Sequence, residues 1–94
     1  MKIEWGEQKR QKTLNERGLD FADLESVNWE EANTIADTRQ PYPEGRFITF
    51  ASVRGRLCVF AWRYRGDSIR VFSLLKANQK EVTKYERSKG LYLR

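Results

Sequence analysis

The fold is decided by residues 46–75, which read RFITFASVRGRLCVFAWRYRGDSIRVFSLL. Three β-rich runs, 46–53, 56–64 and 68–75, are separated by Arg54-Gly55 and by Arg65-Gly66-Asp67. Glycine supplies the positive φ that tight hairpins need, so these runs predict an antiparallel meander. The middle run is continuously apolar from Leu57 to Trp62. A strand that is apolar on both faces is expected at the centre of the sheet, with protein covering each side.

Two helices are expected before the meander. Residues 7–17 are rich in Gln, Lys, Arg and Glu, which favour helix, and Gly18 is placed to end that helix. A second helix is expected from Asp20, whose carboxylate suits an N-cap, with Asp23 completing a capping box. Its apolar side chains recur at Phe21, Leu24 and Val27. This stripe is typical of a helix face that packs on a core.

Alternating or β-favouring residues at 1–5 and 34–37 predict two further short strands. A closing helix is expected over 79–89, begun by Asn78 with Glu81 three residues on and ended by Gly90. The expected fold is α+β: two N-terminal helices packed on an antiparallel sheet of about four strands, plus a C-terminal helix. Residues 1–94 should form a single domain, because a chain this short supports one core.

Composition excludes several classes of protein. The longest apolar run has six residues, too few for a membrane span or a signal peptide, so a cytoplasmic location is expected. The chain has no histidine, which excludes Ser-His-Asp and Cys-His nucleophile systems and most zinc sites. The one cysteine, Cys58, lies in the most apolar stretch and is expected to be a buried, inert thiol. No cofactor and no metal ion are expected.

The net charge of +5 is unevenly distributed along the chain. Residues 1–17, 18–44 and 45–94 carry net charges of +2, −6 and +9. This segregation favours a basic face that binds phosphate groups and an acidic segment that meets something else. The alternative to a binding role is that the charge only keeps a small protein soluble.

Several short motifs occur in a characteristic order and together carry a resemblance that covers nearly the whole chain. They are Trp5, Lys9, the turn from Gly18 to Phe21, Arg46-Phe47, Gly55-Arg56, Arg70 to Ser73, and Lys76-Ala77. In this order and spacing the chain resembles the BrnT toxin family. The resemblance implies a RelE-like fold and a ribonuclease toxin of a type II toxin–antitoxin system. It also implies a partner, a BrnA-like ribbon-helix-helix antitoxin that neutralises the toxin, dimerises to give a heterotetramer and, as the complex, binds operator DNA.

The chain departs from the family's pattern at three places. Gly6 stands where the family usually has Asp, Arg17 where it has His, and Leu75 where it has Arg. Leucine cannot replace a guanidinium as a bidentate phosphate ligand. A weakened nuclease that acts mainly through its antitoxin complex is therefore the alternative function, and plain DNA binding is a third, weaker one because no recognition helix stands out.

Cleaving RNA internally needs a base for the 2′-hydroxyl, cations for the charged phosphorane and an acid for the leaving oxygen. Without histidine or a carboxylate cluster, metal-independent cleavage by cations is expected. The catalytic candidates are Arg56, Arg70, Glu44 and Lys76. Arg56 and Arg70 share a face only if the strand register permits, and each has the alternative role of a solvated charge. Glu44 is a general base or an arginine partner, or simply a solvated loop carboxylate.

The candidates for binding the RNA backbone are Lys9, Lys12, Arg17 and Arg46. Such contacts position a nucleic acid without reading its sequence. Tyr85 has two possible roles: it stacks on a base or donates a proton, or it packs in the core beside Val82.

Overall fold

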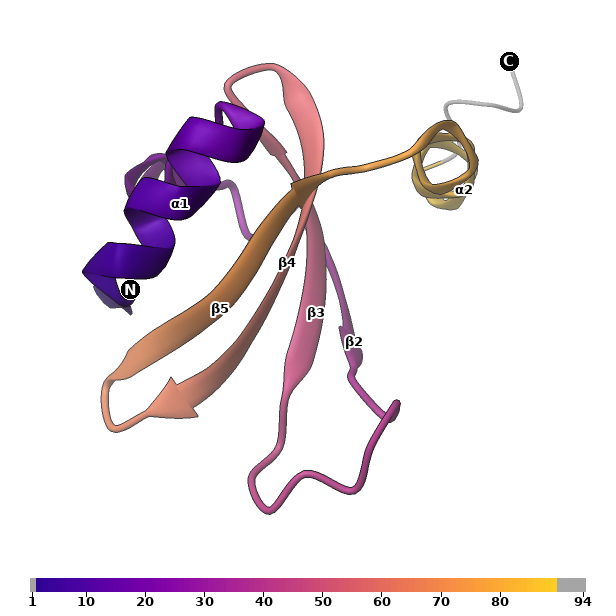
Figure 1. The fold of residues 1–94 in the computed structure, drawn as a ribbon. Coiled ribbons are helices and arrows are strands. Elements are labelled where there is room, and N and C mark those ends of the chain that lie inside the picture. The colour runs from indigo at the N-terminus through magenta and orange to yellow at the C-terminus, as the bar shows by residue number, and fades with distance from the viewer. Residues whose placement is uncertain (1, 90–94) are drawn as a thin grey trace.

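A computed structural model describes residues 2–89 (Figure 1). Along the chain the elements are β1 (Lys2–Glu4), α1 (Glu7–Arg17), the 3₁₀ helix η1 (Phe21–Ser26), β2 (Asn33–Ala36), β3 (Phe47–Val53), β4 (Arg56–Arg65), β5 (Ser68–Lys76) and α2 (Gln79–Ser88). The mixed α+β class is confirmed, and the predicted bounds of α1 are met at both ends. Gly90, the predicted end of the last helix, and Met1 lie outside the described residues.

The five strands form one sheet in the order β1-β5-β4-β3-β2. The meander is confirmed, with β4 at the centre between β3 and β5. The prediction of about four antiparallel strands was wrong in two respects. The sheet has five strands, and β1 pairs with β5 in parallel. β1 and β5 cannot form a hairpin, because β2, β3 and β4 lie between them in the chain.

One face of the sheet, here called the core face, holds the hydrophobic core. Its strands place Phe60, Trp62, Ile69, Val71 and Leu74 on this side, each at most 3% exposed. The cover comes from η1 and the residues after it, through Phe21, Leu24, Val27 and Trp29. α1 lies on the same side of the sheet, and α2 lies on the other side (Figure 1). Trp5 closes the cluster with an edge-to-face contact on Phe21.

The second predicted helix is a single 3₁₀ segment. A 3₁₀ helix has three residues per turn, so side chains three apart lie directly above one another. Phe21, Leu24 and Val27 have that spacing, and all three are buried in this conformation. Asp20 is the N-cap as predicted, since its carboxylate accepts from the backbone N–H of Ala22 at 3.0 Å. The expected capping box is absent from this described segment, because Asp23 pairs instead with Arg54 at 3.3 Å.

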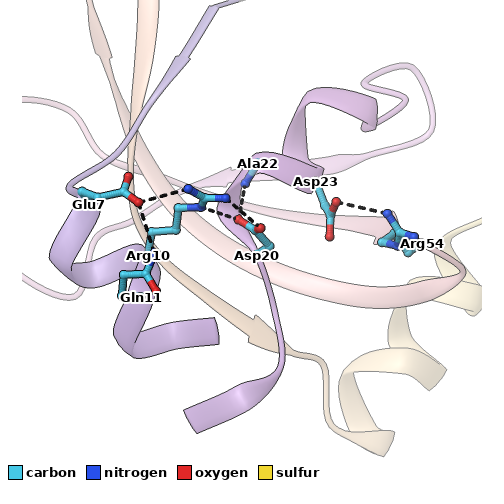
Figure 2. Close-up of polar contacts among 7 residues, drawn as sticks. All are labelled: Glu7, Arg10, Gln11, Asp20, Ala22, Asp23 and Arg54. Carbon is cyan, nitrogen blue, oxygen red and sulfur yellow. Dashed lines mark hydrogen bonds and ion pairs between the residues drawn. The ribbon is translucent and has the colours of Figure 1, made fainter. Parts of the chain in front are cut away.

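α1 is joined to the rest of the molecule mainly by polar contacts (Figure 2). Arg10 donates from two guanidinium nitrogens to the two carboxylate oxygens of Asp20, at 2.8 and 3.1 Å. Arg10 also donates to Glu7 at 3.0 Å. This pairing holds the pKa of Asp20 below its usual range. A bidentate arginine–carboxylate contact fixes orientation as well as distance, so it positions the polar helix against the start of η1.

The second face of the sheet, here called the open face, carries Ile48, Phe50, Val59, Arg63, Arg70 and Leu75. α2 covers one end of it, where Tyr85 and Val82 approach Phe50 and Leu57. The predicted capping box of α2 is confirmed: Asn78 accepts from the Glu81 N–H at 2.8 Å, and Glu81 accepts from the Asn78 N–H at 2.8 Å. The other end of the open face is free of α2.

A β-bulge interrupts β5. Ala61 pairs with Ser73 and Trp62 pairs with Val71, so Phe72 is an extra residue that no residue of β4 faces. A bulge shifts the register by one and therefore exchanges the two faces for every residue beyond it. If the register were counted from the Phe60–Leu74 pair without this bulge, Arg70 would fall opposite Tyr64, on the core face.

Within the described residues, no helix is long and apolar enough to cross a membrane.

A buried polar contact on the core face gives a test of the packing. The Trp62 indole N–H donates to the Thr49 hydroxyl at 2.7 Å, and Thr49 is fully buried. Thr49→Val keeps the side-chain shape but leaves the indole N–H without its partner. We expect the free energy of unfolding to fall by about 1 to 3 kcal/mol, the usual cost of a buried unsatisfied donor. Urea unfolding followed by tryptophan fluorescence measures it.

The control is Thr34→Val. Thr34 shares a hydrogen bond with Thr49 at 2.8 Å but lies on an exposed edge strand, so its loss should matter less. Equal stability of wild type and Thr49→Val would show that the indole contact contributes nothing.

Candidate functional site

The bulge places two arginines side by side on the open face. In the shifted register Arg63 of β4 lies directly opposite Arg70 of β5. Side chains opposite one another in an antiparallel pair have Cβ atoms about 4.5 to 5.5 Å apart. Two arginine side chains therefore start from neighbouring positions at the end of the sheet that α2 leaves free.

Arg46 adds a third guanidinium at the same place. It precedes β3, and its side chain reaches across the sheet to lie 4.2 Å from the ring centre of Phe72, the bulge residue. On its other side the Tyr42 ring lies 4.3 Å away. Stacking between two aromatic rings fixes a planar guanidinium while leaving its N–H edge available. Arg46, Arg63 and Arg70 are named here the arginine cluster.

The members of the cluster differ in their carboxylate partners. Arg63 donates to Glu44, which comes from the loop between β2 and β3. Arg70 makes no hydrogen bond or ion pair with any group of residues 2–89, and one of its terminal nitrogens lies beside the backbone of Gly6. The other acid on this part of the face, Glu4, pairs with Arg65 at 3.5 Å. The prediction that Glu44 is an arginine partner is confirmed, and its role as a base stays a prediction.

Arg56 and Lys76 lie at the opposite end of the sheet. Arg56 starts β4, seven residues before Arg63, which corresponds to about 23 Å along a strand. An odd separation also puts the two side chains on opposite faces. Lys76 pairs with Cys58 across the strands, and both cations partly offset the burial that raises the pKa of the Cys58 thiol. The structure thus separates two of the four predicted catalytic residues from the arginine cluster.

The predicted RNA-binding residues are also divided. Arg46 belongs to the arginine cluster, whereas Lys9, Lys12 and Arg17 are exposed on α1. Arg17 donates to the backbone carbonyl of Leu74 at 3.3 Å. Arg17 therefore contacts the edge of β5 past Ser68 to Arg70, the residues that pair with β1.

Two further residues have well-defined positions. Leu75 lies on the open face opposite Val59 and is 41% exposed, so it shares a face with the arginine cluster. The Tyr85 hydroxyl donates to the backbone carbonyl of Glu31 at 2.7 Å. Partial burial raises the pKa of Tyr85. Tyr85 therefore links α2 to the chain before β2, in agreement with a packing role.

The loop that carries Tyr42, Glu44 and Arg46 is anchored by Asp37. The Asp37 side chain is fully buried and accepts from the Arg39 guanidinium at 2.8 and 2.7 Å. This pairing lowers the pKa of Asp37 to about 2, so the carboxylate stays ionised at all but very acidic pH. The backbone N–H of Asp37 donates to the carbonyl of Arg46 at 2.8 Å, which joins the two ends of the loop.

Across residues 2–89 no group of three or more acidic or cysteine side chains is arranged to hold a metal ion. The site therefore offers cations and aromatic rings, a combination suited to a phosphodiester with attached bases. A family model described as "Ribonuclease toxin, BrnT, of type II toxin-antitoxin system" matches residues 5–81. The chain belongs to the BrnT family. It is accordingly a ribonuclease toxin of a type II toxin–antitoxin system, and an antitoxin partner follows from that membership. No curated protein matches the chain.

The pairing of Arg63 with Arg70 in this BrnT toxin is absent from the sequence-based candidates, although a signal for it exists. Arg65 pairs with Ser68, so the hairpin loop is Gly66-Asp67 alone. A two-residue loop fixes the register of the strands that it joins. Counting outward from that loop places Arg63 opposite Arg70. The predicted three-residue separation, Arg65-Gly66-Asp67, obscures this.

The Asp37–Arg39 anchor predicts how stability depends on pH. Because the folded-state pKa of Asp37 is below its ordinary value of about 3.9, its ionised form stabilises the fold above about pH 4. That contribution is lost as the pH falls from about 4 towards 2. Asp37→Asn should therefore be less stable than wild type at pH 6, and the difference should shrink below pH 4. Urea unfolding at pH 6, 4 and 3 measures it.

Asp67→Asn serves as the control, since Asp67 is exposed in the hairpin loop. It should change stability much less at pH 6. A difference between wild type and Asp37→Asn that stays constant with pH would contradict the ionic anchor.

Proposed function

We propose that this toxin is a metal-independent endoribonuclease with a RelE-like architecture, and that it cleaves RNA on the open face at the arginine cluster. The observation that supports this most is the position of Arg70. It lies on the open face opposite Arg63, near the bulge residue on which Arg46 stacks, and it has no hydrogen-bond or ion-pair partner in residues 2–89. Maintaining such a concentration of like charge is unfavourable unless an anion binds there.

The arginine cluster suits the charge changes of RNA cleavage. When the 2′-hydroxyl attacks the phosphorus, negative charge grows on the phosphorane oxygens, and fixed guanidinium groups stabilise it. Arg70 and Arg46 are proposed for this role. Glu44, the carboxylate held at the cluster by Arg63, is proposed as the base or as the partner that orients Arg63. The donors available are cations rather than a carboxylate set, which favours chemistry without a metal ion.

The remaining predicted residues are proposed to bind the flanking RNA. Lys9 and Lys12 on α1, with Arg17 at the β5 edge, offer exposed positive charge for backbone phosphates. Arg56 lies about 23 Å from Arg63 along β4, and Lys76 ends β5 at the same far end of the sheet, so we assign them contacts with distant phosphates rather than with the scissile one.

We further propose a BrnA-like ribbon-helix-helix antitoxin as the partner. Its dimerisation would give a heterotetramer, DNA would be bound only through that complex, and the toxin would act in the cytoplasm. An acidic antitoxin segment laid over the arginine cluster would block RNA directly, over an interface on the order of 1,600 Å².

The alternative function is a weakened nuclease that acts chiefly through its antitoxin complex in repressing the operon. Leu75 supports it, because an exposed leucine on the open face occupies a position where the family pattern has an arginine. The two functions differ in how much RNA cleavage the isolated chain retains.

The first functional prediction concerns Arg70. Arg70→Ala should fold normally, since the side chain is half-exposed and has no protein partner in residues 2–89. RNA cleavage should fall by roughly 10² or more, the scale for losing one transition-state donor. Cleavage of a single-stranded RNA by antitoxin-free protein is measured with EDTA present throughout.

Arg54→Ala is the matched control, because it removes an exposed arginine from the hairpin at the other end of the sheet. Full activity in Arg70→Ala would remove Arg70 from the site. Activity that EDTA abolishes and Mg²⁺ restores would contradict the metal-independent mechanism.

Reversing the family departure gives the second prediction. Leu75 is exposed on the open face, between the arginine cluster and α2, so Leu75→Arg should be accommodated without unfolding. An added guanidinium on this face should raise RNA cleavage and growth inhibition. Leu75→Gln, similar in size but uncharged, is the control. An equal gain with glutamine, or no gain with arginine, would show that charge at position 75 is irrelevant.

The third prediction concerns the antitoxin. If it covers the arginine cluster, reversing charge there with Arg70→Glu should weaken both RNA cleavage and antitoxin binding, whereas Arg54→Glu should change neither. Calorimetric titration with the co-expressed antitoxin measures binding. Tight binding that is unaffected by Arg70→Glu would mean that the antitoxin docks elsewhere.

A further inference from the structure

We propose that Arg63 and Arg70 form a clamp for one phosphodiester group, and that Glu44 is the internal anion which the phosphate displaces. The proposal rests on the function proposed above, because it names the ligand of the same face. It adds Arg63, which sequence reasoning left outside the site, as a phosphate-binding residue. It also gives Glu44 a role in binding that differs from that of a base.

The first argument is the cross-strand geometry. Arg63 and Arg70 are direct partners in the β4–β5 register, so their side chains leave neighbouring positions on the open face. Without a ligand the Arg63 guanidinium reaches Glu44, and that of Arg70 lies beside Gly6. Like charges directly opposite one another destabilise an antiparallel pair. A phosphodiester has two non-bridging oxygens, and each guanidinium can donate to them in a planar, charge-assisted contact.

The second argument is the asymmetry of the pair. Arg63 is 27% exposed and has Glu44 as its partner, while Arg70 has no partner in residues 2–89. Glu44 is 64% exposed and comes from a loop. Ion pairs at such exposed positions contribute little to stability. Replacing this carboxylate by a phosphate exchanges one single negative charge for another at small cost.

The third argument is the local charge. Among residues 2–89, the open face near the clamp carries four arginines and two carboxylates: Arg46, Arg63, Arg65 and Arg70, with Glu4 and Glu44. Glu4 is the strand partner of Arg70, but its carboxylate pairs with Arg65 at 3.5 Å. When Glu44 leaves, the clamp and Arg46 together hold three positive charges with no carboxylate ion-paired to any of them. Arg46 is fixed between two rings and can contact the next phosphate without rearranging.

The test measures binding separately from cleavage. A fluorescein-labelled 2′-O-methyl RNA lacks the attacking hydroxyl, so anisotropy reports binding of intact ligand over a range of NaCl concentrations. Arg63→Ala should weaken binding about ten- to a hundredfold, the scale for a hydrogen bond to a charged group. Its salt-dependence slope should become shallower by about 0.7, the value for one phosphate contact on a single strand. Arg63→Lys keeps the charge but loses the planar, bidentate donor group, so its affinity should lie between those of wild type and Arg63→Ala.

Glu44→Gln is the decisive variant. If Glu44 competes with the phosphate, its neutralisation should tighten binding, by up to about fivefold for a surface ion pair. The matched controls are Arg54→Ala and Asp23→Asn, since these residues form a comparable exposed ion pair at 3.3 Å far from the clamp. Each changes the net charge by the same amount as its counterpart. Circular dichroism and urea unfolding establish that all variants fold.

The outcomes separate the clamp from the nuclease function. If wild type cleaves RNA but Arg63→Ala and Glu44→Gln bind like their controls, the clamp is wrong and the function stands. If wild type cleaves nothing while the binding pattern holds, the phosphate site stands and the nuclease function fails. A Glu44→Gln protein with reduced cleavage and unchanged affinity would overturn displacement and identify Glu44 as a base.

Discussion

The open face depends on one extra residue in β5. The two-residue loop sets Arg63 opposite Arg70, and the bulge at Phe72 lets the same strand still place Leu74 on the face that packs on η1. An unpaired guanidinium kept among Ile69, Val71 and Trp62 would cost several kcal/mol. Bulge and arginine therefore require each other. Phe72 also supplies one of the two rings that hold Arg46, so the bulge residue contributes to the positions of two of the three cations.

The sequence predicts those parts of the fold that local chemistry dictates. Glycine at 55 and 66 marks the two hairpins, and Asn78 with Glu81 marks the start of α2. Burial fixes β4 at the centre, because the run from Leu57 to Trp62 has no polar alternation. These features need only neighbours within a few residues, and the structure has each of them.

Features that depend on distant partners were harder to predict. The parallel pairing of β1 with β5 is a long-range choice that no local pattern encodes. The bulge is reflected in the spacing of the buried hydrophobic residues of β5, Ile69, Val71 and Leu74, which are two and then three positions apart. Strict alternation along β5, counted back from Leu74, would have placed Arg70 on the core face, away from Arg63. The residues proposed from the sequence are arginines, lysines and a glutamate, and only the strand register decides which of them lie together.

Burial of Cys58 has a consequence for following the protein in solution. The thiol is fully buried on the central strand, and burial raises its pKa, so the reactive thiolate is scarce in the native state. A thiol reagent can reach it only when the sheet opens. Because the chain has no other cysteine, its labelling rate under native conditions reports the population of opened molecules. The same rate, measured with and without a bound partner, gives the stabilisation that the partner confers.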